Sequence, residues 1–313
     1  AGGAGGVGRG VDGGAGGPAR GAPGARRMTS DVWRSAWRGM GEESRRRMLV
    51  ALSALPLVVI TVVGFGFSKL PSVGGSRPLN HDDLAQIASI LTILTFFMFS
   101  FVLSFASVFV AAPAISSDIE SGVILSIVPR PIRRADIVVG RWLGLSLVVV
   151  IFTITATLVE LEVVNLVIGY LPPHPFEAIS FLVAEGVVAV TMGLLFSTRV
   201  APMTGGIVAT ILLLAVWFAG IVGNIGFSFG NDTVAAFGTI SRLVVPTDGM
   251  WRGALYYLQT PQLLAVQALA GRRAAANPFF AGTPPALPYL AWTAVWILGL
   301  LSLSVLSFRR REL

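Results

Sequence analysis

The sequence has no cysteine and little charge. Without cysteine, the chain can form neither disulfides nor thiolate metal sites, and it has no thiol nucleophile. Charged residues make up 12% of the sequence and apolar residues 54%, whereas soluble domains carry about a quarter charged residues. A water-soluble fold is therefore not expected.

Lysine and histidine are also scarce, which limits the catalytic sites that this chain can build. The only lysine, Lys69, follows Ser68 and not glycine, so the chain has no phosphate-binding P-loop with which to hydrolyse ATP. The only histidines, His81 and His174, fall in expected outer loops, which argues against a paired-histidine zinc site on a helix. We predict no catalytic residue, no cofactor site and no metal site in this chain.

Long apolar blocks accompany the low charge. A bilayer core of about 30 Å is crossed by about 20 apolar helical residues, and the blocks approach that length. We therefore predict an all-α, polytopic membrane protein with about six transmembrane helices. These form one transmembrane domain over residues 48–313, with spans at 48–67, 85–110, 142–159, 178–196, 203–222 and 289–308.

The net charge of +7 is explained better by membrane topology than by nucleic-acid binding, because the arginines lie beside apolar spans. The positive-inside rule places both termini and the loop 112–141 in the cytoplasm, with the loop 223–288 outside the cell membrane. The arginines that set this orientation are Arg130, Arg133, Arg134, Arg141, Arg199, Arg309, Arg310 and Arg311. The outer loop also carries arginines, but long loops cross largely regardless of charge. Tyr289 and Trp292 would then lie in the outer aromatic belt.

Two segments precede the first predicted span. Residues 1–27 are almost entirely Gly, Ala, Pro and Arg, which predicts a disordered tail, and we expect Met28 to be a functional start. The alternative is a basic tail that contacts anionic lipid. Residues 28–47 carry Trp33 and Trp37 at helical spacing among arginines, which predicts an amphipathic interfacial helix; a plain linker is the alternative.

Three carboxylates fall in or near the predicted spans. Glu185 lies well inside the fourth span, and Glu160 and Glu162 lie near the outer end of the third. An ionised carboxylate facing lipid at mid-depth costs at least about 2.5 to 3.5 kcal/mol, so these side chains should face a partner or a wet cavity. They are candidates for a substrate or proton pathway, and a structural polar contact is the alternative.

Small residues gather on the fifth predicted span, among them Ala219, Gly220 and Gly223. Such residues let transmembrane helices approach closely. The pattern fits a dimer seam and fits close packing within one subunit equally well.

The loop after the second predicted span surrounds a short apolar stretch with charge, glycine and proline. Glu120 precedes Gly122, which permits a sharp turn, and residues 123–128 are predicted to form a short apolar helix that Pro129 and Pro131 would end. A short apolar helix exposed to water is not stable alone. We therefore expect it to dock into a groove of a partner protein.

This loop resembles the coupling helix of type-2 ABC transporter permeases, the family that includes multi-copper enzyme maturation permeases and drug or peptide export permeases. In that family an acidic-x-Gly turn, a short helix, an Arg-Pro-Ile-x-Arg run and a Gly-Arg/Lys-x-x-Gly start of the third span make the element that seats in the ATPase subunit. The matching residues are Glu120, Gly122, Arg130, Pro131, Ile132, Arg134, Asp136, Gly140, Arg141 and Gly144. Residues 245–254 and 308–313 are also similar to the family, so the resemblance covers nearly everything after Met28. The chain departs from the family at Val123 and Leu125, where relatives often have Thr and an acidic residue.

The resemblance implies that the chain is the transmembrane subunit of an ATP-driven transporter, and it favours export over import. Its partners would be a second permease subunit and separate ATPase chains, which bind the ATP and Mg. The implied ATPase-coupling residues are Glu120, Gly122, Arg130, Pro131, Arg133 and Arg134. The alternatives are a secondary transporter driven by an ion gradient, with Glu185 as its ion or proton site, and a membrane-embedded enzyme or assembly factor.

Overall fold

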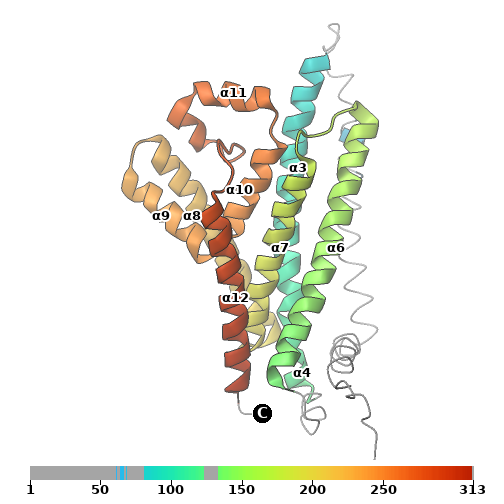
Figure 1. The fold of residues 1–313 in the computed structure, drawn as a ribbon, viewed down its shortest axis with the longest axis vertical. Helices are drawn as coiled ribbons and strands as arrows, with labels where there is room; N and C mark the ends of the chain where they lie inside the picture. The colour runs from blue at the N-terminus through green and yellow to red at the C-terminus, as the bar shows by residue number, and fades with distance from the viewer. Residues whose placement is uncertain (1–60, 62–63, 67, 69–80, 123–132, 312–313) are drawn as a thin grey trace, which may run out of the picture.

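A computed structural model describes residues 61, 64–66, 68, 81–122 and 133–311. The elements that these residues form are helices, with no strand among them (Figure 1). They are α3 (His81–Ala111), α4 (Pro113–Glu120), α6 (Arg134–Ile168), α7 (Pro175–Ser197), α8 (Pro202–Ser228), α9 (Asp232–Val244), α10 (Thr247–Leu258), α11 (Pro261–Leu269), the 3-10 helix η1 (Gly271–Ala276) and α12 (Leu287–Arg309). The predicted tail 1–27, the interfacial helix 28–47 and most of the first predicted span lie outside the described residues.

Five helices in the described part of the chain are long and apolar enough to cross a membrane, as a polytopic membrane protein requires. They are α3 together with α4, then α6, α7, α8 and α12, and each contains one of the predicted spans from the second to the sixth. The long helices run along the longest axis of the molecule in Figure 1. We call the end that holds α4 and the last turn of α12 the C-terminal end, and the end that holds α11 the opposite end.

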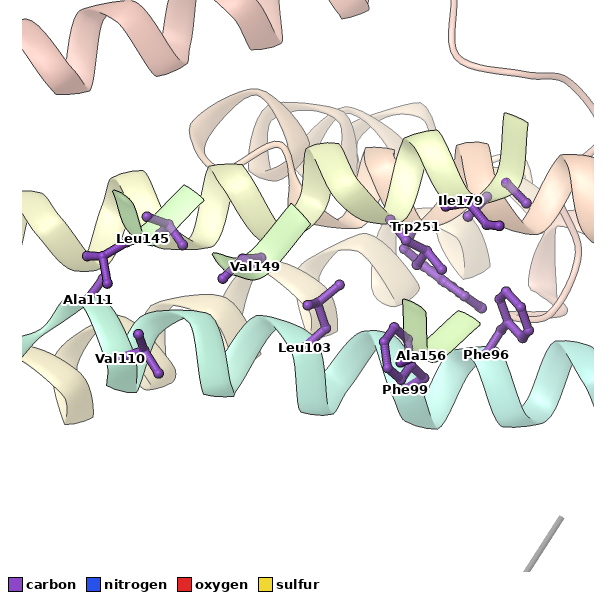
Figure 2. Packing of buried hydrophobic residues seen from close by; sticks show 14 of the residues in the cluster. Phe96, Phe99, Leu103, Val110, Ala111, Leu145, Val149, Ala156, Ile179 and Trp251 are labelled. Atoms are coloured by element: carbon purple, nitrogen blue, oxygen red, sulfur yellow. The ribbon is translucent and has the colours of Figure 1, made fainter. Parts of the chain in front are cut away.

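The helix α7 lies at the centre of the bundle, where it packs against α3, α6, α10 and α12. The core consists of apolar side chains that these helices turn toward one another. Figure 2 shows Phe99 and Leu103 of α3 close to Val149 and Ala156 of α6, with Trp251 of α10 nearby. This packing leaves the outer faces of α6, α8 and α12 covered with exposed leucine, isoleucine and valine, as lipid contact requires.

The helix α6 is longer at both ends than the span 142–159 that hydropathy predicts. It begins at Arg134, after an extended Arg133 at the N-cap position. Asp136 lies inside the first turn, where a carboxylate favours the helix dipole. The helix continues through Glu160 and Glu162 to Gly169, whose φ of 74° provides a left-handed C-cap. Hydropathy marks the apolar section of a helix and misses the polar turns that continue it.

The region 223–288, which the sequence predicts to be an outer loop, is mostly helical. The helix α8 extends to Ser228, α9 turns back along α8, and α10 packs against α7, so only α11 and η1 lie above the bundle at the opposite end (Figure 1). The helices α9 and α10 are too short for a span, so the hydropathy of the sequence does not reveal them. His81, also expected in an outer loop, is the first residue of α3.

A proline separates α3 from α4. Pro113 has no backbone N–H and cannot continue the hydrogen-bond ladder of α3. The first backbone N–H groups of α4 therefore need other acceptors, and the Ser197 hydroxyl oxygen accepts from the N–H of Ile115 at 2.8 Å and of Ser116 at 3.1 Å. The last residue of α7 thereby fixes α4 against the bundle.

Candidate functional site

A small pocket lies among α3, α7, α8 and α10. Its polar wall consists of Ser100, Ser104, Glu185, Thr247 and Asp248, and all five side chains are buried. Its apolar wall is mostly aromatic and consists of Phe97, Phe101, Phe105, Leu213, Leu214, Trp217 and Trp251. An apolar, concave site with a few convergent polar groups is the usual form of a small-molecule site.

Glu185 is the acidic centre of the polar wall. It is 3% exposed and lies near the middle of α7. The Ser100 hydroxyl is 2.7 Å from Oε1 and 2.9 Å from Oε2 of Glu185, and the Ser104 hydroxyl donates to Oε1 at 2.7 Å. Because the two serines are four residues apart on α3, they lie on one face of that helix. Within the described part of the chain, Glu185 forms no ion pair.

Asp248, the second carboxylate, is held by an arginine. The Arg242 Nε donates to Oδ2 of Asp248 at 2.6 Å, and its Nη2 donates to the Gly220 carbonyl at 3.1 Å and to Oδ1 of Asn224 at 2.7 Å. Arg242 lies in the last turn of α9 and Asp248 in the first turn of α10, so each charge is favourable for its helix dipole. A Cβ at Gly220 would lie 2.6 Å from Oδ2 of Asp248, which explains why glycine is required there.

The turn between α9 and α10 is closed by aromatic side chains of α12. The Tyr289 hydroxyl donates to the Arg242 carbonyl at 3.2 Å, Trp292 Nε1 to the Leu243 carbonyl at 3.0 Å, and Trp296 Nε1 to the Val244 carbonyl at 2.8 Å. The last carbonyls of a helix have no partner within it, and inside a membrane they must find one. The aromatic residues expected in an outer belt therefore cap α9 from one face of α12.

The aromatic wall is a connected cluster. The rings of Phe101 and Trp217 meet edge to face with centroids 4.8 Å apart, and Phe97 lies 5.9 Å from Trp217 and 5.6 Å from Trp251. Among the residues that line the pocket, the half-buried ones are Phe101, Phe105, Leu214 and Trp217. All four lie on α3 and α8, so the opening of the pocket lies between these two helices.

The other two predicted pathway carboxylates are not part of this pocket. Glu160 is 2% exposed on α6, and its Oε1 has no hydrogen-bond partner among the residues that the structure describes. Glu162 is exposed on the same helix. The structure therefore brings Glu185 together with Asp248, which the sequence placed in an outer loop, and not with Glu160 or Glu162.

The small residues of α8 contact other helices of the same chain. A Cβ at Gly223 would lie 2.4 Å from the Cα of Gly238 in α9, and Gly220 faces Asp248 of α10. Ala219 is buried at 8% exposure. Their described contacts therefore match the packing alternative of the sequence analysis.

Four of the predicted ATPase-coupling residues fall in the described part of the chain, and they lie at the C-terminal end. Glu120 is exposed at the end of α4, and Gly122 follows it with a φ of 70°, a left-handed conformation that favours glycine. Arg133 is exposed before α6, whereas Arg134 donates to the carbonyls of Arg309 at 3.2 Å and Arg311 at 2.8 Å. Arg134 thus caps the end of α12. Arg130 and Pro131 lie outside the described residues.

Other arginines at the C-terminal end connect the helix ends to one another. Arg141 forms an ion pair with Asp118 of α4. Arg199 donates to the Ser307 hydroxyl at 2.6 Å, and Arg311 donates to the Thr198 carbonyl at 2.8 Å. The ends of α4, α6, α7 and α12 are therefore fixed to one another.

The sequence Gly226-Phe227-Ser228-Phe229-Gly230 fits the Gly-x-Ser-x-Gly pattern of hydrolase nucleophiles. In hydrolases this serine lies on a turn from a strand to a helix. Here Ser228 ends α8, and its hydroxyl donates to the Ile225 carbonyl at 2.7 Å. The pattern therefore does not have the strand-to-helix turn that a hydrolase nucleophile requires.

Of the residues that line the Glu185 pocket, the sequence indicated only Glu185 itself. Ser100 and Ser104 could have been found, because they are a polar pair four residues apart in an apolar span. Among the described residues, no group of three His, Asp or Glu side chains is placed to hold a metal ion. Comparisons of the chain with protein-family models and with curated proteins found no match.

Proposed function

We propose that this chain is the membrane-embedded subunit of a transporter, with the Glu185 pocket as its substrate site. The observation that carries the proposal is a buried carboxylate within a bundle of apolar helices, next to an aromatic pocket that opens between two of them. Burial of a charge among apolar helices is costly and is typical of substrate or ion pathways.

We further propose that a separate ATPase drives transport and binds at the C-terminal end. The resemblance of residues 120–144 to type-2 ABC permeases supports this assignment. The exposed Glu120, Arg133 and Arg309 provide charges that a partner could contact. The arginine contacts at this end would transmit movement of α4 to α6, α7 and α12, because those helix ends are joined.

Purification of the tagged full-length chain from its native membrane in mild detergent tests this proposal. We expect a second chain with a P-loop sequence in the complex, and we expect the complex to hydrolyse ATP. In that complex, Gly122→Val should reduce the recovery of the ATPase several-fold. A β-branched residue with a φ of 70° costs about 1 to 3 kcal/mol, and no other described residue has a heavy atom within 4 Å of the added Cβ to cause a clash.

Gly122→Asn is the matched control, since asparagine tolerates the left-handed conformation better than other residues. Recovery of the ATPase should be close to wild type in this variant. Equal recovery in both variants would mean that the turn at Gly122 does not position the partner, and a complex without any P-loop chain would contradict the ATPase assignment.

The predicted orientation places the C-terminal end in the cytoplasm. Because the chain has no cysteine, Ser121→Cys introduces a unique label beside the exposed turn. We expect a membrane-impermeant maleimide to label this cysteine only after cells are permeabilised. Gln262→Cys on α11, exposed at the opposite end, should be labelled in intact cells. The reverse pattern would contradict the orientation and the ATPase site together.

An ion-gradient-driven transporter is the second candidate, and it is favoured because Glu185 forms no ion pair with any residue that the structure describes. Such a transporter would need no ATPase. Transport that stops when an ionophore collapses the ion gradient, but continues without ATP, would support this candidate over the first.

A further inference from the structure

The two carboxylates that line the pocket are not neutralised equally. Asp248 is neutralised by Arg242, with Nε and Oδ2 2.6 Å apart. Arg252, on the next turn of α10, donates to the Phe280 carbonyl at 3.3 Å and does not line the pocket. Among the described residues, Glu185 accepts side-chain hydrogen bonds only from the neutral hydroxyl groups of Ser100 and Ser104. An ionised Glu185 therefore lacks a counter-ion in the described part of the chain, and a buried charge without a counter-ion is costly.

The aromatic wall of the pocket can bind an organic cation. Aromatic ring faces attract ammonium groups, and tryptophan does so best. Phe97, Phe101, Trp217 and Trp251 surround the same space that Glu185 lines. A carboxylate together with several aromatic rings therefore combines a full negative charge with surfaces that bind a cation and its apolar substituents.

The position of the opening indicates how a ligand arrives. The half-buried lining residues lie on α3 and α8, and both helices are candidate membrane spans. Phe218, next to Trp217 on α8, is 56% exposed on the outside of the bundle. An opening between two apolar helices admits a molecule that is dissolved in the bilayer, and such a molecule must carry a substantial apolar part.

We propose that the Glu185 pocket binds a small lipophilic organic cation, an ammonium ion with an aromatic or branched alkyl body that enters between α3 and α8. The ammonium group would lie at Glu185, and the apolar body would contact Trp217 and Trp251. The enclosed space is only about 30 Å³, so the pocket must widen between α3 and α8 to admit such a molecule. This inference rests on the proposed function in that it names the class of substrate.

The test is equilibrium binding of radiolabelled benzyltrimethylammonium to the purified full-length chain in lipid nanodiscs. We expect saturable binding that unlabelled benzyltrimethylammonium displaces. Neopentylbenzene has the same shape without the charge, and we expect it to need at least about tenfold higher concentration to compete, since about 1.4 kcal/mol separates tenfold affinities. Equal competition by both compounds would overturn the cation assignment.

Three variants locate the site. Glu185→Gln keeps the shape of the side chain and removes its charge, so affinity should fall at least about tenfold. Trp217→Leu removes one ring and should lower affinity about threefold to tenfold. Glu177→Gln is the matched control on the same helix, because Glu177 is exposed and outside the pocket; its affinity should equal wild type. If Glu185→Gln does not elute as a folded protein, Trp217→Leu alone decides the location.

Unchanged affinity in Trp217→Leu, or absence of saturable binding by the wild-type chain, would overturn the inference. The assay needs neither ATP nor a partner. Its failure therefore leaves the proposed ATPase-driven transport open, and failure to recover an ATPase leaves the cation assignment open.

Discussion

Replacement of Gly223 with valine is expected to destabilise the protein by about 3 kcal/mol or more, because α8 and α9 touch through their backbones there. An added Cβ would lie 2.4 Å from the Cα and 2.9 Å from the N of Gly238, both backbone atoms that cannot rotate away. The two helices must separate to admit the side chain. The measurement is the thermal unfolding midpoint of the purified protein in detergent, with the yield of folded protein as a second readout.

Gly299→Val on α12 is the matched control. This glycine also lies in a membrane-length helix, and nothing lies within 4 Å of an added Cβ. Its midpoint should stay near that of wild type. A Gly223 variant as stable as the Gly299 variant would mean that α8 and α9 do not pack as described.

The loss of the contacts between α8 and α9 would also disturb the pocket that Glu185 and Asp248 line. Arg242 is on α9, so separation of α9 from α8 removes its hydrogen bonds to Gly220 and Asn224 and weakens its hold on Asp248. This dependence explains why a site lined by α3, α7, α8 and α10 needs a fifth helix that does not line it.

Long spans and a single buried charge could be predicted from the sequence because each has a strong local signal. Five apolar blocks correspond to α3, α6, α7, α8 and α12, and Glu185 stands out as a carboxylate in the middle of an apolar block. Gly122 was also expected at a sharp turn, and its φ of 70° agrees with that expectation. In each case the residue and its neighbours in sequence contain the information.

The rest of the pocket depends on contacts between distant residues. Asp248 and Arg242 lie in a region that hydropathy assigns to an outer loop. The packing of α10 on α7 brings Asp248 into the bundle, and the packing of α9 on α8 brings Arg242 beside it. Similarly, Trp292 was expected in an outer aromatic belt, but it caps α9 through a hydrogen bond to the carbonyl of Leu243, 49 residues away. Pairings over such distances leave no trace in a single sequence.

Replacement of Arg242 with methionine is expected to destabilise the protein by about 3 to 5 kcal/mol, because it leaves the Asp248 carboxylate buried without its partner. The Asp248 side chain is 7% exposed and that of Arg242 20%, so water can replace little of the lost interaction. The change also removes donors to the Gly220 carbonyl and to Asn224. Chemical unfolding of the purified protein in detergent micelles measures the effect.

The double variant Arg242→Met/Asp248→Asn tests whether the unpaired charge is the cause, since asparagine keeps the shape of aspartate and removes its charge. We expect the double variant to be more stable than Arg242→Met alone, although both lack the arginine. Arg272→Met is the matched control: its ion pair with Asp232 spans 3.9 Å and both side chains are at least half exposed, so the loss should be within about 1 kcal/mol. If the double variant is no more stable than the single one, the arginine acts through its bonds to α8, and the charge of Asp248 is compensated in another way.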